Sequence, residues 1–159
     1  MTIWVDADAC PKPVIKILFK AAERTGINLI LVANRTLATP KCANIRSIQV
    51  ATGFDVADTK IISDMMPGDL VVTSDIPLAA DVIKKGAQVL SPRGGIFNTE
   101  NIGARLNMRD FMDTMRSSGL YSKGPLPFTN AHRKTFADQL DGWLARYKSR
   151  SIQRCSNPN

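Results

Sequence analysis

The sequence predicts one α/β domain built in three layers, with a mainly parallel sheet of about five strands and a helix at the carboxyl end. The chain has 159 residues and is 44% hydrophobic, which suits a single domain with a full core. Short apolar segments alternate with amphipathic helical segments, and Gly and Pro separate them. We therefore expect this domain over residues 1–150 and a disordered tail over 151–159, where the apolar period is lost.

The first two elements are expected to be a strand and a helix. Residues 2–5 form a short apolar run rich in strand formers, and Pro11 and Pro13 suit the first turn of the helix that follows. This helix should end before Gly26. It places four apolar residues on one face: Val14, Ile17, Leu18 and Ala21.

Two further strands are expected next. Residues 27–33 are almost continuously apolar, which is typical of a strand buried on both faces. Residues 34–44 contain turn-forming residues and predict a loop, and residues 45–50 alternate in polarity like a strand. Gly53 then ends this pattern.

The middle of the chain continues the alternation of helices and strands. Residues 54–65 carry apolar side chains at helical spacing and are followed by the stop signal Met66-Pro67-Gly68. A strand over 70–73, a helix over 77–85 and a strand over 87–90 come next. This order implies a parallel sheet with right-handed crossovers, in which ligands bind beyond the carboxyl ends of the strands.

Two helices and a connector complete the predicted domain. Apolar residues at helical spacing predict a fourth helix over 104–115 and a fifth over 136–147. The apolar face of the fourth helix consists of Ala104, Met108, Phe111, Met112 and Met115. Residues 117–128, which lie between the two helices, are rich in Gly and Pro and favour irregular structure. This connector is a candidate for a mobile flap over an active site.

The composition points to a cytoplasmic protein with a polyanionic partner. The net charge is +7 and the pI is near 9.6, which suits nucleic acid. No segment approaches the roughly 18 uninterrupted apolar residues of a membrane helix, and the amino end lacks the pattern of an export signal. The three cysteines are far apart, so they indicate reduced thiols and neither a disulfide framework nor a zinc site.

Asp6 and Asp75 each follow an apolar strand. In a parallel sheet both would emerge at the same edge, which is where functional carboxylates belong. Aspartate in such a position also caps the amino terminus of the following helix. For each residue taken alone, both interpretations stand.

Asp58 lies within the apolar stripe of its predicted helix, four residues after Phe54 and three before Ile61. A carboxylate in this place is costly unless a cation, a metal or hydrogen bonds compensate it. A divalent metal shared with Asp6 and Asp75 meets that need, and Mg²⁺ or Mn²⁺ is the expected ion. Pairing with a lysine is the alternative.

The other aspartates receive lesser roles. Asp8, two residues after Asp6, is interpreted as a catalytic or metal-assisting group, with a helix cap before Pro11 as the alternative. Asp55 is expected to cap its helix. The remaining acids of this region are assigned to the exposed surface: Asp64, Asp69 and Asp81.

Four basic residues are candidates for holding phosphates. Arg105 and Arg109 share a predicted helix face, Arg93 lies in a glycine-rich loop after a strand, and Lys12 follows the first aspartates. For the helical arginines, a solvated basic face is the alternative. His132, the one histidine, has no acid or cysteine at a recognisable catalytic spacing and is interpreted as a surface helix residue.

Several sequence segments together resemble the bacterial YaiI/YqxD family, and the similarity spans nearly the whole chain. The segments that carry it are Val5-Asp6-Ala7-Asp8-Ala9-Cys10-Pro11, Gly68-Asp69-Leu70-Val71, Thr73-Ser74-Asp75-Ile76-Pro77-Leu78-Ala79, Ser91-Pro92-Arg93-Gly94, Asn107-Met108-Arg109-Asp110 and Gly124-Pro125 through Phe128 to Arg133.

The order of the aspartates adds a more distant resemblance. Asp6 after the first strand, Asp58 in a helix and Asp75 after a later strand look like the acids of PIN-like and NYN-type ribonuclease domains, which hold a divalent metal. This resemblance implies a PIN-like fold with metal ligands at these three positions. It also implies a fourth acid after strand 87–90, and residues 91–95 contain none.

These observations favour a metal-dependent ribonuclease that hydrolyses phosphodiester bonds, with Asp6, Asp8 and Asp75 in catalytic roles. Single-stranded RNA is the expected substrate, because no sequence-reading module is apparent. One alternative is a phosphatase that resembles the haloacid dehalogenases through Asp6-Ala7-Asp8, although Cys10 and Asp69 depart from that family's motifs. The other is an RNA-binding or regulatory module without turnover.

Overall fold

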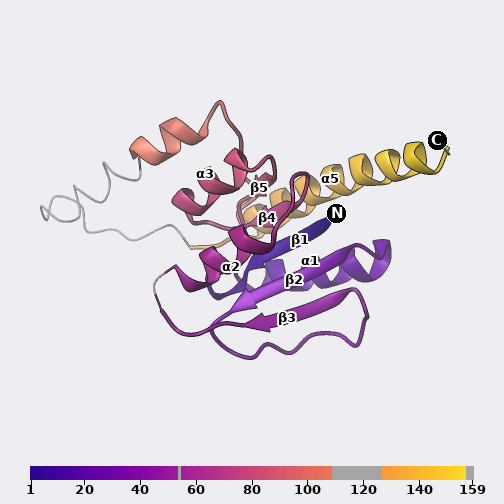
Figure 1. Ribbon diagram of the computed structural model, residues 1–159, viewed down its shortest axis with the longest axis horizontal. Helices are drawn as coiled ribbons and strands as arrows, with labels where there is room; N and C mark the ends of the chain where they lie inside the picture. Colours follow the sequence, from indigo (N-terminus) through magenta and orange to yellow (C-terminus); the bar gives the residue numbers. More distant parts are fainter. Residues whose placement is uncertain (54, 109–126, 157–159) are drawn as a thin grey trace, which may run out of the picture.

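The computed structural model describes residues 1–53, 55–108 and 127–156, with side chains as far as Lys148. Within these residues, six strands form one sheet in the order β3-β2-β1-β4-β5-β6. Figure 1 labels the first five of these strands, β1 to β5. All neighbouring strands are parallel except β5 and β6. The five predicted strands are confirmed, and the short β6 adds a sixth. The strands are β1 (Thr2–Asp6), β2 (Asn28–Ala33), β3 (Ile45–Gln49), β4 (Leu70–Val72), β5 (Gln88–Leu90) and β6 (Ile96–Phe97).

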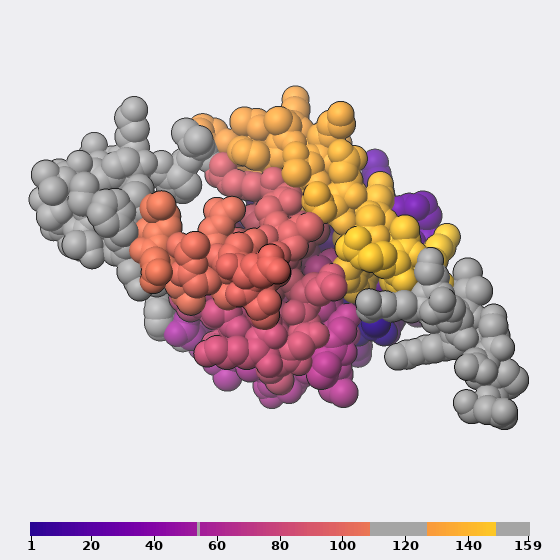
Figure 2. All heavy atoms as spheres, turned by 90° about the horizontal axis from the view of Figure 1, so that it is seen from above, coloured from indigo at the N-terminus to yellow at the C-terminus, as the bar shows by residue number. Residues whose placement is uncertain are grey.

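Helices cover both faces of the sheet, which confirms the three layers. On one face α1 contacts α5, and on the other α2 contacts α3. Figure 2 shows α5 as a continuous ridge along one side of the molecule. None of the helices in the described ranges is long and apolar enough to cross a membrane. The helices are η1 (Ala7–Ala9), α1 (Lys12–Thr25), α2 (Val56–Asp64), α3 (Ile76–Lys84) and α5 (Asn130–Ser156), and residues 102–108 are also helical.

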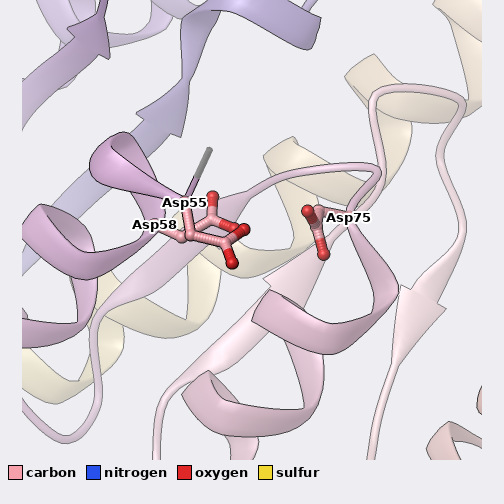
Figure 3. Close-up of side chains that lie close together, drawn as sticks. All are labelled: Asp55, Asp58 and Asp75. Atoms are coloured by element: carbon pink, nitrogen blue, oxygen red, sulfur yellow. The ribbon is translucent and has the colours of Figure 1, made fainter. Parts of the chain in front are cut away.

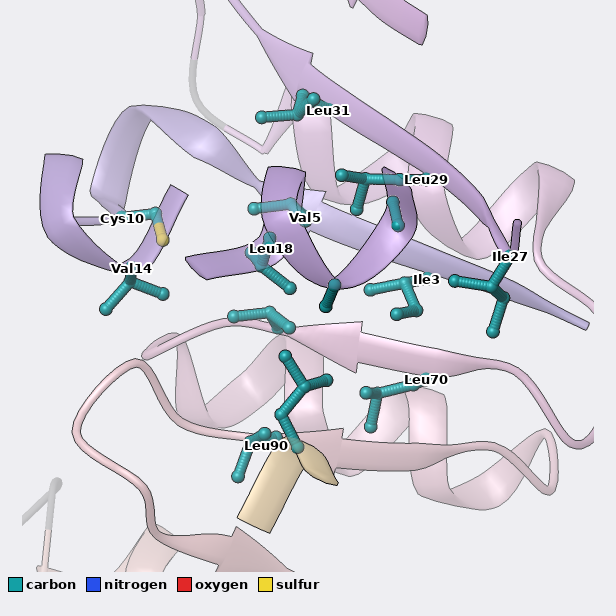
Figure 4. Packing of buried hydrophobic residues seen from close by; sticks show 14 of the residues in the cluster. Ile3, Val5, Cys10, Val14, Leu18, Ile27, Leu29, Leu31, Leu70 and Leu90 are labelled. Carbon is teal, nitrogen blue, oxygen red and sulfur yellow. The ribbon is translucent and has the colours of Figure 1, made fainter. Parts of the chain in front are cut away.

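The pleat of the sheet divides the core into two halves, because successive side chains of a strand point to opposite faces. On β1, Ile3 and Val5 belong to the half beneath α1 and α5, whereas Trp4 belongs to the half beneath α2 and α3. Figure 4 shows the first half, where residues of β1, β2, β4 and β5 pack against α1. The apolar face predicted for α5 is confirmed by its buried residues, Phe136, Leu140, Trp143 and Leu144.

The ends of the helices follow their local sequence. Gly26 ends α1 in the left-handed conformation, with φ of 74°, and its N–H donates to Ala22 O. At the start of α5 the Thr129 N–H donates to His132 Nδ1, and the His132 N–H donates back to Thr129 Oγ1. His132 is therefore part of a reciprocal cap, and its predicted place on a helix is confirmed.

Helix α5 continues to Ser156, beyond the expected end of the fifth helix at residue 147. The domain boundary at residue 150 and the disordered tail over 151–159 stay predictions. The predicted connector falls almost entirely on residues 109–126, outside the described residues, and its role as a flap stays a prediction.

The helical segment 102–108 matches the start of the predicted fourth helix. Ile102 packs against the core, but Met108 is 59% exposed, although we expected it on the apolar face. Six residues turn an α-helix by about 240°, so the two side chains point in different directions. Ala104, the other described residue of the predicted apolar face, is also exposed. The remaining three, Phe111, Met112 and Met115, lie outside the described residues.

Asp69 is buried, which corrects its assignment to the exposed surface. It is 4% exposed and accepts three hydrogen bonds, from Trp4 Nε1 at 3.1 Å, Thr2 N at 3.0 Å and Met66 N at 2.9 Å. These bonds satisfy a buried carboxylate and tie the start of β1 to the turn before β4. Asp69 is thus a structural residue at the amino end of the strands.

The sheet has a switch point between β1 and β4. Chain connections run outward from β1 to β2 and β3 on one side, and continue through β4 and β5 on the other. In open α/β sheets this is the place where a crevice for ligands forms, beyond the carboxyl ends of the strands. Asp6 ends β1 and Thr73 follows β4, so both lie at the carboxyl edge of the sheet beside this switch point.

Candidate metal centre

Asp6 and Asp75 are connected by one buried hydroxyl, that of Thr73. Thr73 is 1% exposed, and its Oγ1 donates to Asp6 Oδ2 at 3.2 Å. The same Oγ1 accepts the backbone N–H of Asp75 at 3.0 Å. Asp6 is itself 8% exposed and makes no helix-capping hydrogen bond. Of the two interpretations of Asp6, the structure therefore contradicts the helix cap.

For Asp75, the helix cap is confirmed, and the functional interpretation stays a prediction. Its Oδ1 accepts the Leu78 N–H at 3.0 Å, which makes it the N-cap of α3. Its carboxylate also lies beside those of Asp55 and Asp58, with ligand oxygens of the three residues all within 4.8 Å of one another. Figure 3 shows Asp55 and Asp58 at the start of α2 and Asp75 opposite them at the start of α3. The cap holds the Asp75 side chain in place against α3.

Asp55 was expected to cap its helix, and the structure corrects this. It occupies the N-cap position of α2, but its side chain makes no capping hydrogen bond. Its φ is 61°, and it is the one non-glycine residue with positive φ in the described ranges. Aspartate tolerates this conformation better than most residues, although at some cost. Its carboxylate joins Asp58 and Asp75 instead.

Burial and the repulsion between neighbouring carboxylates raise the pKa values of two aspartates in this centre. The pKa of Asp58 is raised to about 7, first by burial and then by the negative charges of Asp75, Asp6 and Asp55. The pKa of Asp6 is raised by burial, partly offset by the Thr73 hydrogen bond, and raised further by Asp75 and Asp8. Among the described side chains, no lysine or arginine forms an ion pair with Asp6, Asp55, Asp58 or Asp75. The lysine partner considered for Asp58 is therefore absent from the described residues.

The residues present fit a hard divalent cation. All donors are carboxylate oxygens, the ligands that Mg²⁺ and Mn²⁺ prefer. Opposite ligands of Mg²⁺ lie about 4.0–4.2 Å apart, twice the usual bond length, and the ligand oxygens of the three aspartates already lie within 4.8 Å of one another. A bound cation would also replace the protons that crowding holds on Asp58. Asp55, Asp58 and Asp75 are thus the set best placed to hold a metal, with Asp6 beside them.

Asp8 lies outside this cluster. Its Oδ2 accepts the Asn34 N–H at 2.8 Å, and its Oδ1 lies 4.0 Å from Arg35 Nε. Asp8 still contributes to the centre through its charge, since it raises the pKa of Asp6. A catalytic role for Asp8 stays a prediction, whereas its contacts show that it fixes the loop after β2.

The predicted phosphate-binding residues are spread over several elements. Lys12 is exposed at the first position of α1. Arg93 is half-buried in the turn after β5, where its N–H donates to Ser91 Oγ. Arg105 is exposed, and its guanidinium lies over the Phe97 ring, 5.7 Å from the centroid. Arg109 lies outside the described residues.

Sequence reasoning missed two members of the centre. Asp55 stands three residues before Asp58, a spacing that brings two side chains to the same side of a helix start, and this signal could have placed it in the cluster. Thr73 carried no signal of its own, because its role depends on β1 and β4 being neighbours. Cys10 is buried beside the centre, and burial followed by the charge of Asp6 raises its pKa to about 12. It is therefore a neutral thiol and a poor nucleophile or ligand.

Fold and site together define an α/β protein with an acidic centre at the switch point of its sheet. The chain matches the family model described as "Uncharacterized BCR, YaiI/YqxD family" over residues 4–146. It is 58% identical over 149 residues to a UPF0178 protein of Cellvibrio japonicus, covering 93% of this chain and 99% of that protein. It is 59% identical over 146 residues to a UPF0178 protein of Thioalkalivibrio sulfidiphilus, covering 92% and 99%. The chain belongs to the YaiI/YqxD family.

One solved structure also shows a likeness. It is the crystal structure of Rae1 (YacP) from Bacillus subtilis, W164L mutant, with a TM-score of 0.37 and 16% identity, covering 89% of this chain and 97% of that one. At this TM-score the likeness supports no conclusion about this chain. The PIN-like and NYN-type resemblance therefore stays a prediction.

Proposed function

We propose that this protein is a ribonuclease that uses Mg²⁺ or Mn²⁺ to hydrolyse phosphodiester bonds at the acidic centre. The observation that carries the proposal is the convergence of Asp6, Asp55, Asp58 and Asp75 at the switch point, with no basic partner among the described side chains. Four clustered carboxylates without a cation repel one another and destabilise the folded state, and a bound hard metal ion would remove this repulsion. Asp55 supplies the fourth acid that residues 91–95 lack.

Each residue of the centre has a distinct task in this proposal. Asp55, Asp58 and Asp75 would hold the metal, with Asp75 fixed by its cap on α3. A bound divalent cation would supply Lewis-acid activation of water and offset the charge of the phosphate. Asp6, oriented by Thr73, has a raised pKa and would accept the proton of the attacking water. Asp8 would adjust the proton affinity of Asp6 through its charge.

A polyanionic substrate is supported by the surface of α1. Lys12, Lys16 and Lys20 are exposed and recur every four residues, about 6 Å along the helix, with no acid among residues 12–22. Lys12 stands at the amino end of α1, where the helix dipole makes a positive charge unfavourable. The electrostatics of the helix alone therefore give no reason for a lysine at this position. The row begins at the carboxyl edge of the sheet, where the acidic centre lies. Phosphates of a single RNA strand would suit it.

Removal of two lysines from this row should weaken RNA binding in a salt-dependent way. For Lys16→Ala combined with Lys20→Ala, we expect the slope of log Kd against log salt to fall by about 1.4, roughly 0.7 for each lost phosphate contact with a single strand. Fluorescence anisotropy with a labelled oligonucleotide measures this slope. The matched control, Lys41→Ala combined with Lys84→Ala, removes two exposed lysines near the amino ends of the strands. An equal change in both double variants would contradict a specific role for α1.

Loss of the Thr73 hydroxyl should disturb the centre without removing an acid. In Thr73→Val, Asp6 loses a donor and the Asp75 N–H loses its acceptor. Because the hydrogen bond lowers the pKa of Asp6, its loss should move the acidic limb of the pH–rate profile to higher pH. We expect cleavage about 10–100-fold slower, as for other supporting residues of metal sites. Thr73→Ser keeps the hydroxyl, so its cleavage rate and the acidic limb of its pH–rate profile should match those of the wild type. Failure of this rescue would count against the role of Thr73.

The proposed activity is tested with purified protein and labelled single-stranded RNA. Cleavage is expected with Mn²⁺ or Mg²⁺, and it should be lost in EDTA and in an Asp6→Asn, Asp75→Asn double variant. A Glu23→Gln, Asp138→Asn variant neutralises two exposed acids on α1 and α5 and should remain active. Phosphate release from a phosphatase substrate without RNA cleavage would favour the phosphatase. Binding without either activity would favour a non-catalytic RNA-binding module.

A further inference from the structure

A groove leads away from the acidic centre between α2 and α3. Both helices begin at the centre, with Asp55 and Asp75 as their N-cap residues, so the groove starts at the proposed metal. It has a volume of about 370 Å³, within the range of small-molecule sites. Its lining extends from Asp58 to Ser63 on α2, about 7.5 Å along the helix axis. That length gives room for one base beside a phosphate held at the centre.

The lining combines apolar walls with hydrogen-bond acceptors. Ile62, Pro77 and Leu78 provide the apolar surface, against which a flat ring can pack. The Thr59 hydroxyl donates to Asp55 O at 2.8 Å, so it uses its proton within the protein and offers lone pairs to a ligand. Ser63 adds a second hydroxyl to the lining.

Asp81 adds a carboxylate to the lining of the groove. It is exposed on α3 among the lining residues, and an ionised carboxylate only accepts hydrogen bonds. When Asp58 holds the metal, the polar lining offers mainly acceptors, which match a base edge rich in N–H donors. Guanine presents adjacent N1–H and N2–H groups that one carboxylate can accept together. Uracil presents two carbonyls on either side of a single N–H, and these would face the Asp81 carboxylate unfavourably.

We propose that the groove between α2 and α3 is a nucleobase subsite that selects guanine over uracil in the nucleotide next to the cleaved phosphate. This inference rests on the proposed function for its choice of RNA as the ligand. It adds a specificity that neither the acidic centre nor the lysines of α1 can provide, because carboxylate–metal and lysine–phosphate contacts do not distinguish bases.

Binding of mononucleotides tests the subsite without any turnover. GMP and UMP share ribose and phosphate, so the ratio of their Kd values in Mn²⁺, measured by calorimetry or by NMR titration, isolates the base. We expect GMP to bind at least tenfold more tightly. Asp81→Asn should bring the ratio close to one, because the amide presents a donor as well as an acceptor. Asp138→Asn removes the same charge from an exposed position on α5 and should leave the ratio unchanged.

Each outcome bears on the inference separately from the nuclease proposal. Equal affinity for GMP and UMP, no binding of either, or a preference that persists in Asp81→Asn would overturn the subsite, even if RNA is cleaved. A GMP preference lost in Asp81→Asn would support it, even if cleavage fails. The pentanucleotide UUGUU should bind more tightly than GMP, since its flanking phosphates can reach further contacts. Equal affinity for UUGUU and GMP would mean that the subsite takes its guanine from a free nucleotide, and RNA as its ligand would be overturned.

Discussion

Asp58→Asn is expected to make the metal-free protein more stable at pH 8 and to abolish RNA cleavage. Asparagine has nearly the shape of aspartate but carries no charge, so the variant removes the repulsion from Asp75, Asp6 and Asp55. It also removes one of the three clustered carboxylates. We expect cleavage to fall by at least about 100-fold, because one interaction of this kind in an active site is commonly worth that much. A gain in stability with a loss of activity distinguishes a functional acid from a structural one.

The pH dependence of stability follows from the sign of the pKa shift. The folded pKa of Asp58 is about 7, above the ordinary value of 3.8, so the folded state binds the proton more tightly than the unfolded state. This contribution is fully present below about pH 4 and is lost as the pH rises through 7. Without metal, the melting temperature of the wild type should fall more between pH 5 and pH 8 than that of Asp58→Asn. Differential scanning calorimetry in EDTA at the two pH values measures the difference.

Asp64→Asn is the matched control, because Asp64 lies on the same helix. It pairs with Lys60 at 2.6 Å, and hydrogen bonding with Lys60 lowers its pKa. Its neutralisation should give no stabilisation at pH 8 and should leave cleavage intact. Stabilisation of both variants to the same extent would mean that any lost negative charge on α2 has this effect. The repulsion within the centre would then not be its cause.

Gly94→Ala is expected to cause the largest loss of stability. Gly94 has φ of 92°, and a Cβ there would lie 2.4 Å from Thr135 Cγ2 and 2.8 Å from the backbone N of Phe136. The turn after β5 therefore touches the first turns of α5 so closely that no side chain fits. Left-handed strain costs about 1–2 kcal/mol and overpacking about 1–3 kcal/mol, so we expect a loss of about 2–5 kcal/mol. For a domain of this size the melting temperature falls by roughly 2–4 °C per kcal/mol.

The neighbouring glycine provides the control for this prediction. A Cβ on Gly95 would meet only Ser91 Cβ at 3.7 Å, an ordinary contact, and the backbone of Gly95 has no positive φ. Gly95→Ala should therefore change the melting temperature little. Thermal unfolding of both variants, followed by circular dichroism, makes the comparison. Similar melting temperatures for the two would show that the turn can move away from α5, and the close packing at Gly94 would lose its importance.

The fold could be predicted from the sequence because its signals are local. Each buried strand is an apolar run, and residues such as Gly26 end helices through their own backbone preference. The short β6 and the full length of α5 were missed, since two strand residues and a helix without an apolar period give little signal. Asp69 was misjudged for a different reason. Its burial depends on Trp4, which lies 65 positions away in the sequence.

The acidic centre could be predicted in part. Asp6 and Asp75 follow strands, and the position of Asp58 in an apolar stripe marked it as unusual, so these three were found from local patterns. Asp55 looked like a cap because the sequence does not reveal that its φ is positive. Asp8 was grouped with Asp6 by sequence distance, but the chain turns at η1 and brings Asp8 to Asn34 instead. Side-chain partners that depend on the meeting of distant strands lie beyond local reasoning.

Direct measurement of Mn²⁺ binding tests the central claim, that the aspartates at the switch point hold a divalent metal. Electron paramagnetic resonance of Mn²⁺ titrated with protein at pH 8 should reveal saturable binding. The affinity should be weakened at least tenfold in Asp58→Asn and left unchanged in Asp64→Asn. Absence of saturable binding, or equal affinity in the wild type and Asp58→Asn, would contradict the assignment of this centre.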